Sequence, residues 1–206
     1  MEGLDHFHKI PVEKQNKIID AALNAFGSNG YKKTSAKDIA EAAGISKAMI
    51  FHYFGNKKAL YLYLIQLCGE TVMTEVSEKL NRNNTDFFER IRMAAEIKFD
   101  VLRKRPGVLP FLSSVMNETA DEVKPEVHAI IAGKEASAFR EKMVFEGMDT
   151  SKFKEGIDPK LILKMLIWMS EGYFNDLTSD ADPDFDAFYT EFMDCLNLLK
   201  KACYQS

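Results

Sequence analysis

Residues Thr34–Lys58 read TSAKDIAEAAGISKAMIFHYFGNKK, and the interpretation of the whole chain starts from this segment. It predicts two short helices joined by a glycine turn. Ser35 is placed to cap the first helix, because Asp38 three residues later completes an S-x-x-D capping box. Gly44 then ends that helix, since glycine adopts a positive φ without strain. The segment therefore reads as helix, tight turn, helix.

The second predicted helix begins after Ser46, a capping residue, and ends at Gly55. Ile50 and Phe54 are four residues apart and form its inward face. The side chains expected to point outward are Lys47, Met49, His52 and Tyr53. Helix, turn and helix with a polar outer face is the helix-turn-helix arrangement, whose second helix enters the major groove of DNA.

A third helix is predicted to start at Asn56, with Lys57 and Lys58 in its first turn. Lysines are unfavourable at a helix N-terminus, which attracts negative charge. Free backbone N–H groups and nearby lysines together bind phosphate well. The pair therefore predicts that an anion from outside the chain, such as a DNA phosphate, binds at this helix end.

Residues Ala21–Leu60 resemble the N-terminal domain of TetR-family transcriptional regulators, and the resemblance is specific over about Val12–Leu64. It implies an all-α fold of about nine helices. Residues 1–55 would form a three-helix helix-turn-helix DNA-binding domain, and residues 56–206 a larger helical effector-binding and dimerisation domain. It also implies a homodimer that binds double-stranded operator DNA, and a small-molecule effector, of unknown identity, that changes the affinity for DNA.

Side chains that reach base edges give sequence preference, and groups that hold phosphates give affinity. Lys47 is the candidate for guanine acceptors, and Ala48 and Met49 are candidates for thymine methyl groups. Hydroxyl and imidazole groups are candidates for phosphate, and the resemblance adds Lys57. The predicted DNA-binding residues are Thr34, Ser35, Ser46, Lys47, Ala48, Met49, His52, Tyr53 and Lys57. For each residue alone, the alternative is an ordinary exposed side chain.

Two features depart from the family pattern. Phe51 stands where related recognition helices often carry tyrosine, and it has no group that could bond a phosphate. The first arginine of the chain is Arg82, so the commonest guanine-reading side chain is absent from residues 1–55. We therefore expect sparse base readout, with fit dominated by phosphate contacts and DNA shape.

Charge is unevenly distributed along the chain. The 206 residues carry a formal net charge of −4, which alone argues against nucleic-acid binding. Residues 1–60 nevertheless hold nine lysines against six acidic residues, whereas the remainder is acidic. A basic front on an acidic body suits a protein that touches DNA at one end. A solvated helical surface is the alternative.

The remaining composition predicts a cytoplasmic protein without cofactor or metal. The three cysteines have no CxxC spacing and fit a reducing compartment. No secretory signal or membrane-spanning apolar run is present. Residues 1–10 look like a flexible arm. Its pair His6 and His8 has a spacing that can bind metal, although an incidental pair is the favoured interpretation.

Two strongly apolar helices are predicted near the C-terminus, starting at Asp158-Pro159 and Asp182-Pro183. They carry more apolar surface than one small core needs, so we expect them to pair with a second copy in a four-helix interface, as the resemblance also implies. The predicted interface residues are Leu163, Ile167, Phe174, Phe188, Phe192, Leu196 and Leu199. Burial within one chain is the alternative.

Methionine and aromatic side chains in the C-terminal part could line an apolar effector pocket, and plain core is the alternative for each. The candidates are Met93, Phe99, Phe111, Met116, Phe139, Met143, Trp168 and Tyr173. The leading functional hypothesis is a homodimeric repressor released by a small apolar effector. The alternatives are a DNA-binding regulator controlled by a protein partner, and a helical enzyme. No Ser/His/Asp set, P-loop or HExxH motif supports the enzyme.

Overall fold

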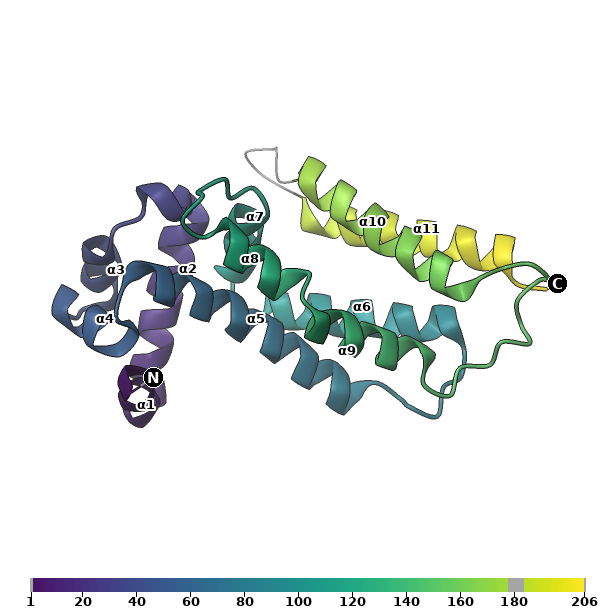
Figure 1. Cartoon of the computed structure of the whole chain (residues 1–206), viewed down its shortest axis with the longest axis horizontal. Coiled ribbons are helices and arrows are strands. Elements are labelled where there is room, and N and C mark those ends of the chain that lie inside the picture. The colour runs from purple at the N-terminus through teal and green to yellow at the C-terminus, as the bar shows by residue number, and fades with distance from the viewer. Residues whose placement is uncertain (1, 178–183, 206) are drawn as a thin grey trace. The chain divides into compact units, whose positions relative to one another are not determined.

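The computed structural model describes residues 2–177 and 184–205, which form eleven helices (Figure 1). They are α1 (Glu2–Lys9), α2 (Val12–Lys33), α3 (Ala36–Ala43), α4 (Lys47–Phe54), α5 (Lys57–Lys79), α6 (Phe87–Arg103), α7 (Val108–Met116), α8 (Lys124–Ile131), α9 (Lys134–Phe145), α10 (Pro159–Leu177) and α11 (Phe185–Cys203). Within these residues, no helix is long and apolar enough to cross a membrane. The all-α fold is as predicted.

Two helices more than the expected nine are present, for two local reasons. Residues 2–9, expected to be a flexible arm, form α1. The second reason is that residues 124–145 form two helices, α8 and α9, with Ala132 and Gly133 between them. A β-carbon at Gly133 would lie 2.2 Å from the carbonyl oxygen of Ala129, so only glycine fits this break.

The chain packs as two compact units. The first comprises Met1–Val72 and Val101–Ala136, and the second comprises Met73–Asp100 and Ser137–Ser206. Helices α7 and α8 therefore pack with the N-terminal helices, although they follow them by many residues. The predicted boundary at residue 56, between a DNA-binding domain and an effector-binding domain, concerns function and not these packing units. It stays a prediction.

The core of the first unit forms where α2 lies against α7. Phe26, Tyr61 and Phe111 are fully buried in it, and the ring centroids of Phe26 and Tyr61 are 4.9 Å apart. Gly27 permits the close approach, because a β-carbon there would lie 3.0 Å from the backbone nitrogen of Phe111. This packing fixes α2, against which α3 lies, and α3 in turn packs against α4.

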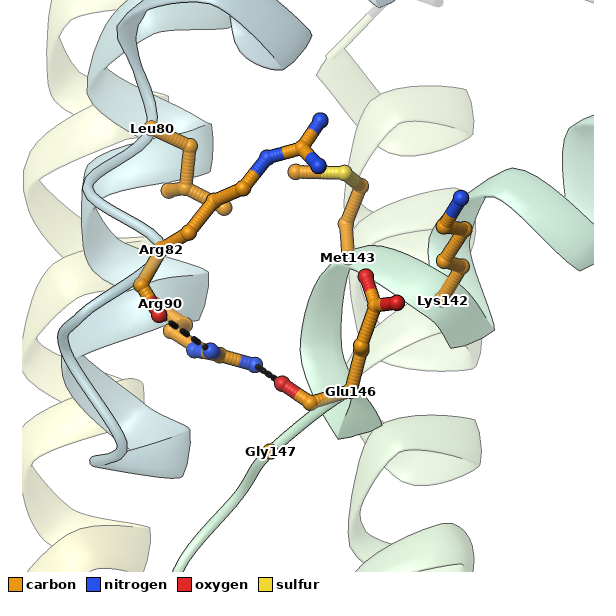
Figure 2. Close-up of a pocket in the computed structure, with 7 residues that line it drawn as sticks. All are labelled: Leu80, Arg82, Arg90, Lys142, Met143, Glu146 and Gly147. Carbon is orange, nitrogen blue, oxygen red and sulfur yellow. Dashed lines mark hydrogen bonds between the residues drawn. The ribbon is translucent and has the colours of Figure 1, made fainter.

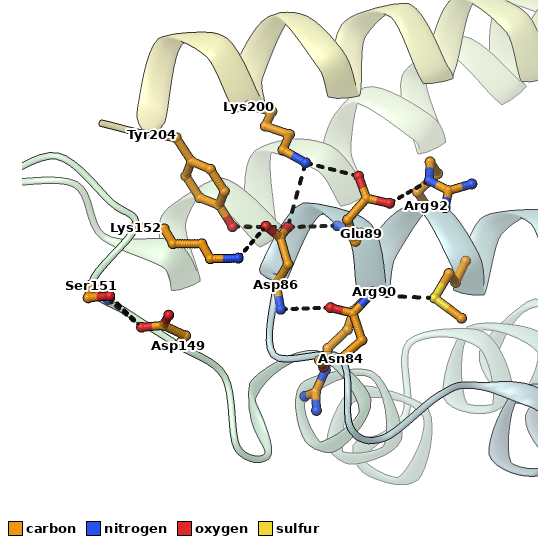
Figure 3. A network of polar contacts seen from close by, with 11 residues as sticks. Asn84, Asp86, Glu89, Arg90, Arg92, Asp149, Ser151, Lys152, Lys200 and Tyr204 are labelled. Carbon is orange, nitrogen blue, oxygen red and sulfur yellow. Dashed lines mark hydrogen bonds and ion pairs between the residues drawn. The ribbon is translucent and has the colours of Figure 1, made fainter. Parts of the chain in front are cut away.

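In the second unit, the start of α6 is held by a buried carboxylate (Figure 3). Asp86 is 8% exposed and accepts hydrogen bonds from the Glu89 backbone N–H at 3.0 Å and from Lys152 Nζ at 3.0 Å. Asp86 also accepts a hydrogen bond from the Tyr204 hydroxyl at 3.2 Å, and it forms an ion pair with Lys200 Nζ at 3.9 Å. The carboxylate thereby ties the loop before α10 and the end of α11 to α6.

These partners outweigh the effect of burial on the Asp86 carboxyl. Burial on its own raises the pKa of a carboxyl group. Here the hydrogen bonds from the Glu89 N–H and Lys152, together with the positive charge of Lys200, bring the pKa of Asp86 below its usual range. The carboxylate is therefore the form that stabilises this unit.

Candidate nucleic-acid interface

The helix-turn-helix segment has the local structure that its capping residues predict. Ser35 Oγ accepts a hydrogen bond from the Asp38 N–H at 3.1 Å, and Ser46 Oγ accepts one from the Met49 N–H at 3.3 Å. Gly44 ends α3 with φ 68°, in the left-handed region. Each of these contacts is set by residues within three positions of one another. The position at which the eight-residue α4 begins is therefore determined by residues close to it in the sequence.

One face of α4 is exposed and the other is buried. Ile50 and Phe54 are buried as predicted. The exposed side chains at the start and middle of the helix are Ser46, Lys47, Ala48, Phe51 and His52, and Met49 is half-buried. Lys47 Nζ lies 5.4 Å from the centroid of the Phe51 ring, and no carboxylate pairs with it in the described part of the chain. The face thus offers one uncompensated ammonium group.

Tyr53 does not belong to this face. Its side chain is 3% exposed, so the expectation that it points outward is wrong. The reason is α1, whose Phe7 ring covers it with a centroid distance of 5.6 Å. Thr34 is 2% exposed, and its hydroxyl donates to the carbonyl oxygens of Gly30 at 2.7 Å and Ala25 at 2.9 Å. The predicted phosphate contacts of Tyr53 and Thr34 are untested, and the burial of both side chains argues against them.

The first turn of α5 also has internal partners that the sequence did not reveal. Lys57 Nζ donates to the carbonyl oxygens of Tyr31 at 2.8 Å and Thr34 at 3.0 Å, and it lies 4.2 Å from the Tyr31 ring centroid. Lys58 Nζ pairs with Glu126 at 2.7 Å. Carbonyls and a carboxylate of the chain thus supply the negative groups that we expected from an outside anion. An ammonium group has three donors, so Lys57 retains one for a phosphate.

Two histidines form a contact that sequence reasoning missed. The rings of His6 in α1 and His52 in α4 are stacked, with centroids 5.1 Å apart and an angle of 14° between their planes. The H-x-H spacing drew attention to His6 and His8 but gave no sign that α4 was the partner. Among the residues that the structure describes, no group of three or more His, Cys, Asp or Glu side chains is placed to hold a metal ion.

The predicted effector-pocket residues have separate surroundings. Phe111 belongs to the core of the first unit, and Phe99 packs against Tyr189 in the second, with centroids 4.7 Å apart. Trp168 is 56% exposed, so much of its side chain faces solvent. Met93, Met116 and Phe139 are half-buried. The side chain of Tyr173 lies outside the described residues.

Met143 lines a surface pocket of about 330 Å³ in the second unit (Figure 2). The other lining residues are Leu80, Arg82, Arg90, Lys142, Glu146 and Gly147. Arg90 is 3% exposed, and its guanidinium group donates to backbone carbonyl oxygens, among them those of Arg82 at 3.1 Å and Val144 at 3.2 Å. The wall thus combines apolar and basic side chains with one carboxylate, that of Glu146.

The predicted interface residues of α10 and α11 mostly face the interior of their own unit. Leu163, Phe188 and Leu196 are buried, and Ile167, Phe192 and Leu199 are half-buried. The side chain of Phe174 lies outside the described residues. A different set is exposed, namely Leu161 at 51%, Met165 at 42% and Trp168 at 56% on α10, with Leu198 at 67% on α11. Spacings of four and three residues place the α10 members on one face.

Comparison with known proteins agrees with this architecture. A sequence profile for "Bacterial regulatory proteins, tetR family" matches residues 18–64. The chain is 24% identical over 190 residues to the biofilm operon icaADBC HTH-type negative transcriptional regulator IcaR of Staphylococcus aureus (strain Newman), covering 91% of this chain and 99% of that protein. It is 32% identical over 90 residues to the HTH-type transcriptional activator FasR of Mycolicibacterium smegmatis, covering 44% of this chain and 41% of FasR.

Solved structures share the fold across most of the chain. The fatty acid degradation regulator FadR of Bacillus halodurans aligns with a TM-score of 0.70 at 20% identity, covering 88% of this chain and 96% of that one. FadR of Bacillus subtilis, solved in complex with stearoyl-CoA, aligns with a TM-score of 0.68 at 20% identity over the same shares. These matches identify residues 18–64 as a helix-turn-helix domain of the TetR family, and the chain as a whole shares the fold of solved TetR-family transcriptional regulators.

Proposed function

We propose that the protein is a homodimeric repressor that binds a two-fold symmetric operator through α4 and leaves it when a small apolar effector binds. The observation that carries the proposal is the exposed face of α4, which is capped at its start and carries an unpaired lysine. In this proposal Lys47 contacts a base edge or a phosphate, Ala48 and Met49 contact thymine methyl groups, and Ser46 and His52 contact phosphates. Ser35 uses its side-chain oxygen to cap α3.

The exposed apolar residues of α10 and α11 support the homodimer. Leu161, Met165, Trp168 and Leu198 are large side chains that a monomer would leave in water. Pairing α10 and α11 with the same helices of a second copy buries them in an isologous four-helix interface. A dimer places two α4 helices on DNA, and the symmetry of the operator then mirrors that of the protein. A regulator that binds chromosomal DNA works in the cytoplasm.

The direction of regulation and the effector are proposed from relatives. IcaR, which matches almost the whole chain, is named a negative regulator, and the FadR structure holds an acyl thioester. An effector acts by binding the DNA-free conformation more tightly than the DNA-bound one. We therefore propose an effector with a long apolar part, bound within the C-terminal helices.

The first experiment is selection of bound duplexes from a random library at two salt concentrations. Wild type is compared with Lys47→Ala and with Lys201→Ala, a control that removes the same charge from the end of α11. We expect a symmetric consensus for wild type and the control, and a weaker or relaxed one for Lys47→Ala. If Lys47 contacts a phosphate, Lys47→Ala makes the plot of log affinity against log salt less steep by about 0.9 per half-site. If Lys47 contacts a base edge, the variant loses the preference at one base position of each half-site.

Effector release is then measured on the selected duplex. A fluorescently labelled duplex bound to the protein is titrated with stearoyl-CoA, and with coenzyme A alone as the control for its charge. Release of the duplex by stearoyl-CoA, but not by coenzyme A, supports an apolar effector. Tight, symmetric DNA binding that no acyl compound changes would instead favour control by a protein partner. A selection without enrichment at either salt would refute the proposed DNA-facing surface.

A further inference from the structure

Helix α1 is a part of the molecule to which the family comparison assigns no role, because the matched profile begins at residue 18. The helix spans Glu2–Lys9 and packs against α4, the helix proposed to read DNA. Three sets of contacts hold α1 there: one at its start, one on its buried face and one on its exposed side.

The start of α1 approaches the end of α4 at backbone distance. A β-carbon on Gly3 would lie 2.5 Å from the carbonyl oxygen of His52 and 2.6 Å from that of Tyr53. The last carbonyls of a helix lack partners within the helix and carry partial negative charge, and the first N–H groups of a helix carry partial positive charge. The two helix ends therefore attract each other, and only glycine allows them to come this close.

The buried face of α1 closes the core beneath α4. Phe7 is fully buried, with its ring centroid 4.8 Å from that of Phe54 and 5.9 Å from that of Tyr63 in α5. His8 Nε2 lies 3.3 Å from the Tyr63 hydroxyl, so α1 is anchored to α5 as well as to α4. The orientation of α4 relative to α5 thus depends on α1.

The exposed side of α1 touches the DNA-facing side of α4. His6 and His52 are both exposed, and their rings stack with centroids 5.1 Å apart. A stacked neighbour restricts the rotation of an exposed ring, which otherwise samples a broad range of its second side-chain angle. A restricted ring loses less conformational entropy when it binds a partner.

We propose that α1 is a positioning element for the recognition helix, and that His6 is a positioning residue that holds the His52 ring ready for its contact with the DNA backbone. The inference rests on the proposed DNA-facing surface of α4. It adds residues 3–7 to the part of the chain that determines DNA affinity.

The test measures affinity for the selected duplex, at fixed pH and salt, for His6→Ala, His6→Phe, His52→Ala and the double alanine variant. His128→Ala is the matched control, because it removes an exposed histidine from α8, a helix that does not contribute to the α1–α4 contact. We expect His6→Ala to lose roughly three- to ten-fold in affinity per half-site, the range for one aromatic pair. His6→Phe keeps a stacking ring and recovers most of the loss. The double variant binds like His52→Ala alone, and His128→Ala binds like wild type.

A second variant tests the helix as a whole. Gly3→Ala forces α1 away from the end of α4, and we expect it to weaken DNA binding while a thermal melt shows the protein still folded. Wild-type affinity for Gly3→Ala or for His6→Ala overturns the inference, as does a His6→Ala loss that persists undiminished in the His52→Ala background. Lys47→Ala separates the two proposals. A loss there with none for His6→Ala removes only the role of α1, whereas no loss for Lys47→Ala removes the DNA-facing surface itself.

Discussion

Replacing Trp168 by alanine should separate the two copies of the proposed dimer. Trp168 is the only tryptophan of the chain and is 56% exposed on α10. A tryptophan has roughly 150–250 Å² to bury, so about 100 Å² remains for a partner. At about 25 cal/mol per Å², burying that area contributes about 2.5 kcal/mol per copy, or about 5 kcal/mol for the two copies of a symmetric interface. Part of this is lost to ordering the side chains, so we expect the dimer dissociation constant to rise by about two to three orders of magnitude.

The assay is sedimentation equilibrium over a range of protein concentrations, with fluorescence of the same samples. Dilution of wild type should move the tryptophan emission to longer wavelength as dimers dissociate and the ring enters water. Val12→Ala is the control, because Val12 is 68% exposed and lies on α2, far along the chain from this face. A Trp168→Ala protein that is folded by circular dichroism and remains dimeric at wild-type concentrations would refute the interface. An emission that does not change while wild type dissociates would also refute it.

Three further outcomes follow from particular contacts. Asp86→Asn should lower the melting temperature at pH 7, because the Asp86 carboxylate has a lowered pKa in the folded protein and so stabilises the fold. This stabilisation is complete above the ordinary carboxyl pKa near 4 and is lost as the pH falls through the lower folded value. The difference in melting temperature between variant and wild type should therefore shrink below pH 4. Gly133→Ala should destabilise the protein by about 1–3 kcal/mol in urea titrations, since its β-carbon would meet the Ala129 carbonyl, and an unchanged midpoint would count against the tight break. Burial raises the pKa of the Cys68 thiol to about 11, so Cys68 should react with Ellman's reagent at neutral pH only after unfolding, which mass spectrometry of the modified peptides would show.

Local signals in the sequence predicted the helix boundaries well where the partners are close along the chain. The caps formed by Ser35 and Ser46 are present as predicted, and Asn56 Oδ1 accepts from the Ala59 N–H at 2.8 Å. Asp158 likewise accepts from the Lys160 N–H at 2.9 Å at the start of α10. These contacts need only the order of residues, because a cap and its N–H group lie two or three positions apart.

The expectations that differ from the structure concern burial decided by residues far apart along the chain. Nothing near Tyr53 shows that Phe7, 46 positions earlier, covers it. On α10, apolar residues occur on every side, so periodicity could not decide which stripe faces inward. The structure buries Leu163 and leaves Trp168 exposed, whereas the sequence suggested an interface role for the first and a pocket role for the second.

The internal contacts of the N-terminal helices change how the DNA interface should be understood. Thr34 and Lys57 donate to backbone carbonyls and Tyr53 is covered by α1, so three of the side chains predicted to contact phosphates also help to hold the helices together. An α4 of eight residues is too short to be stable alone, and its orientation must come from these contacts. In the proposed interface, no arginine precedes Arg82 to read guanine, so we expect discrimination between sequences to depend on how well a rigidly held α4 fits the groove. We therefore expect sequence-dependent groove shape to contribute to recognition, and substitutions of residues that fix α4 to change specificity although those residues do not touch DNA.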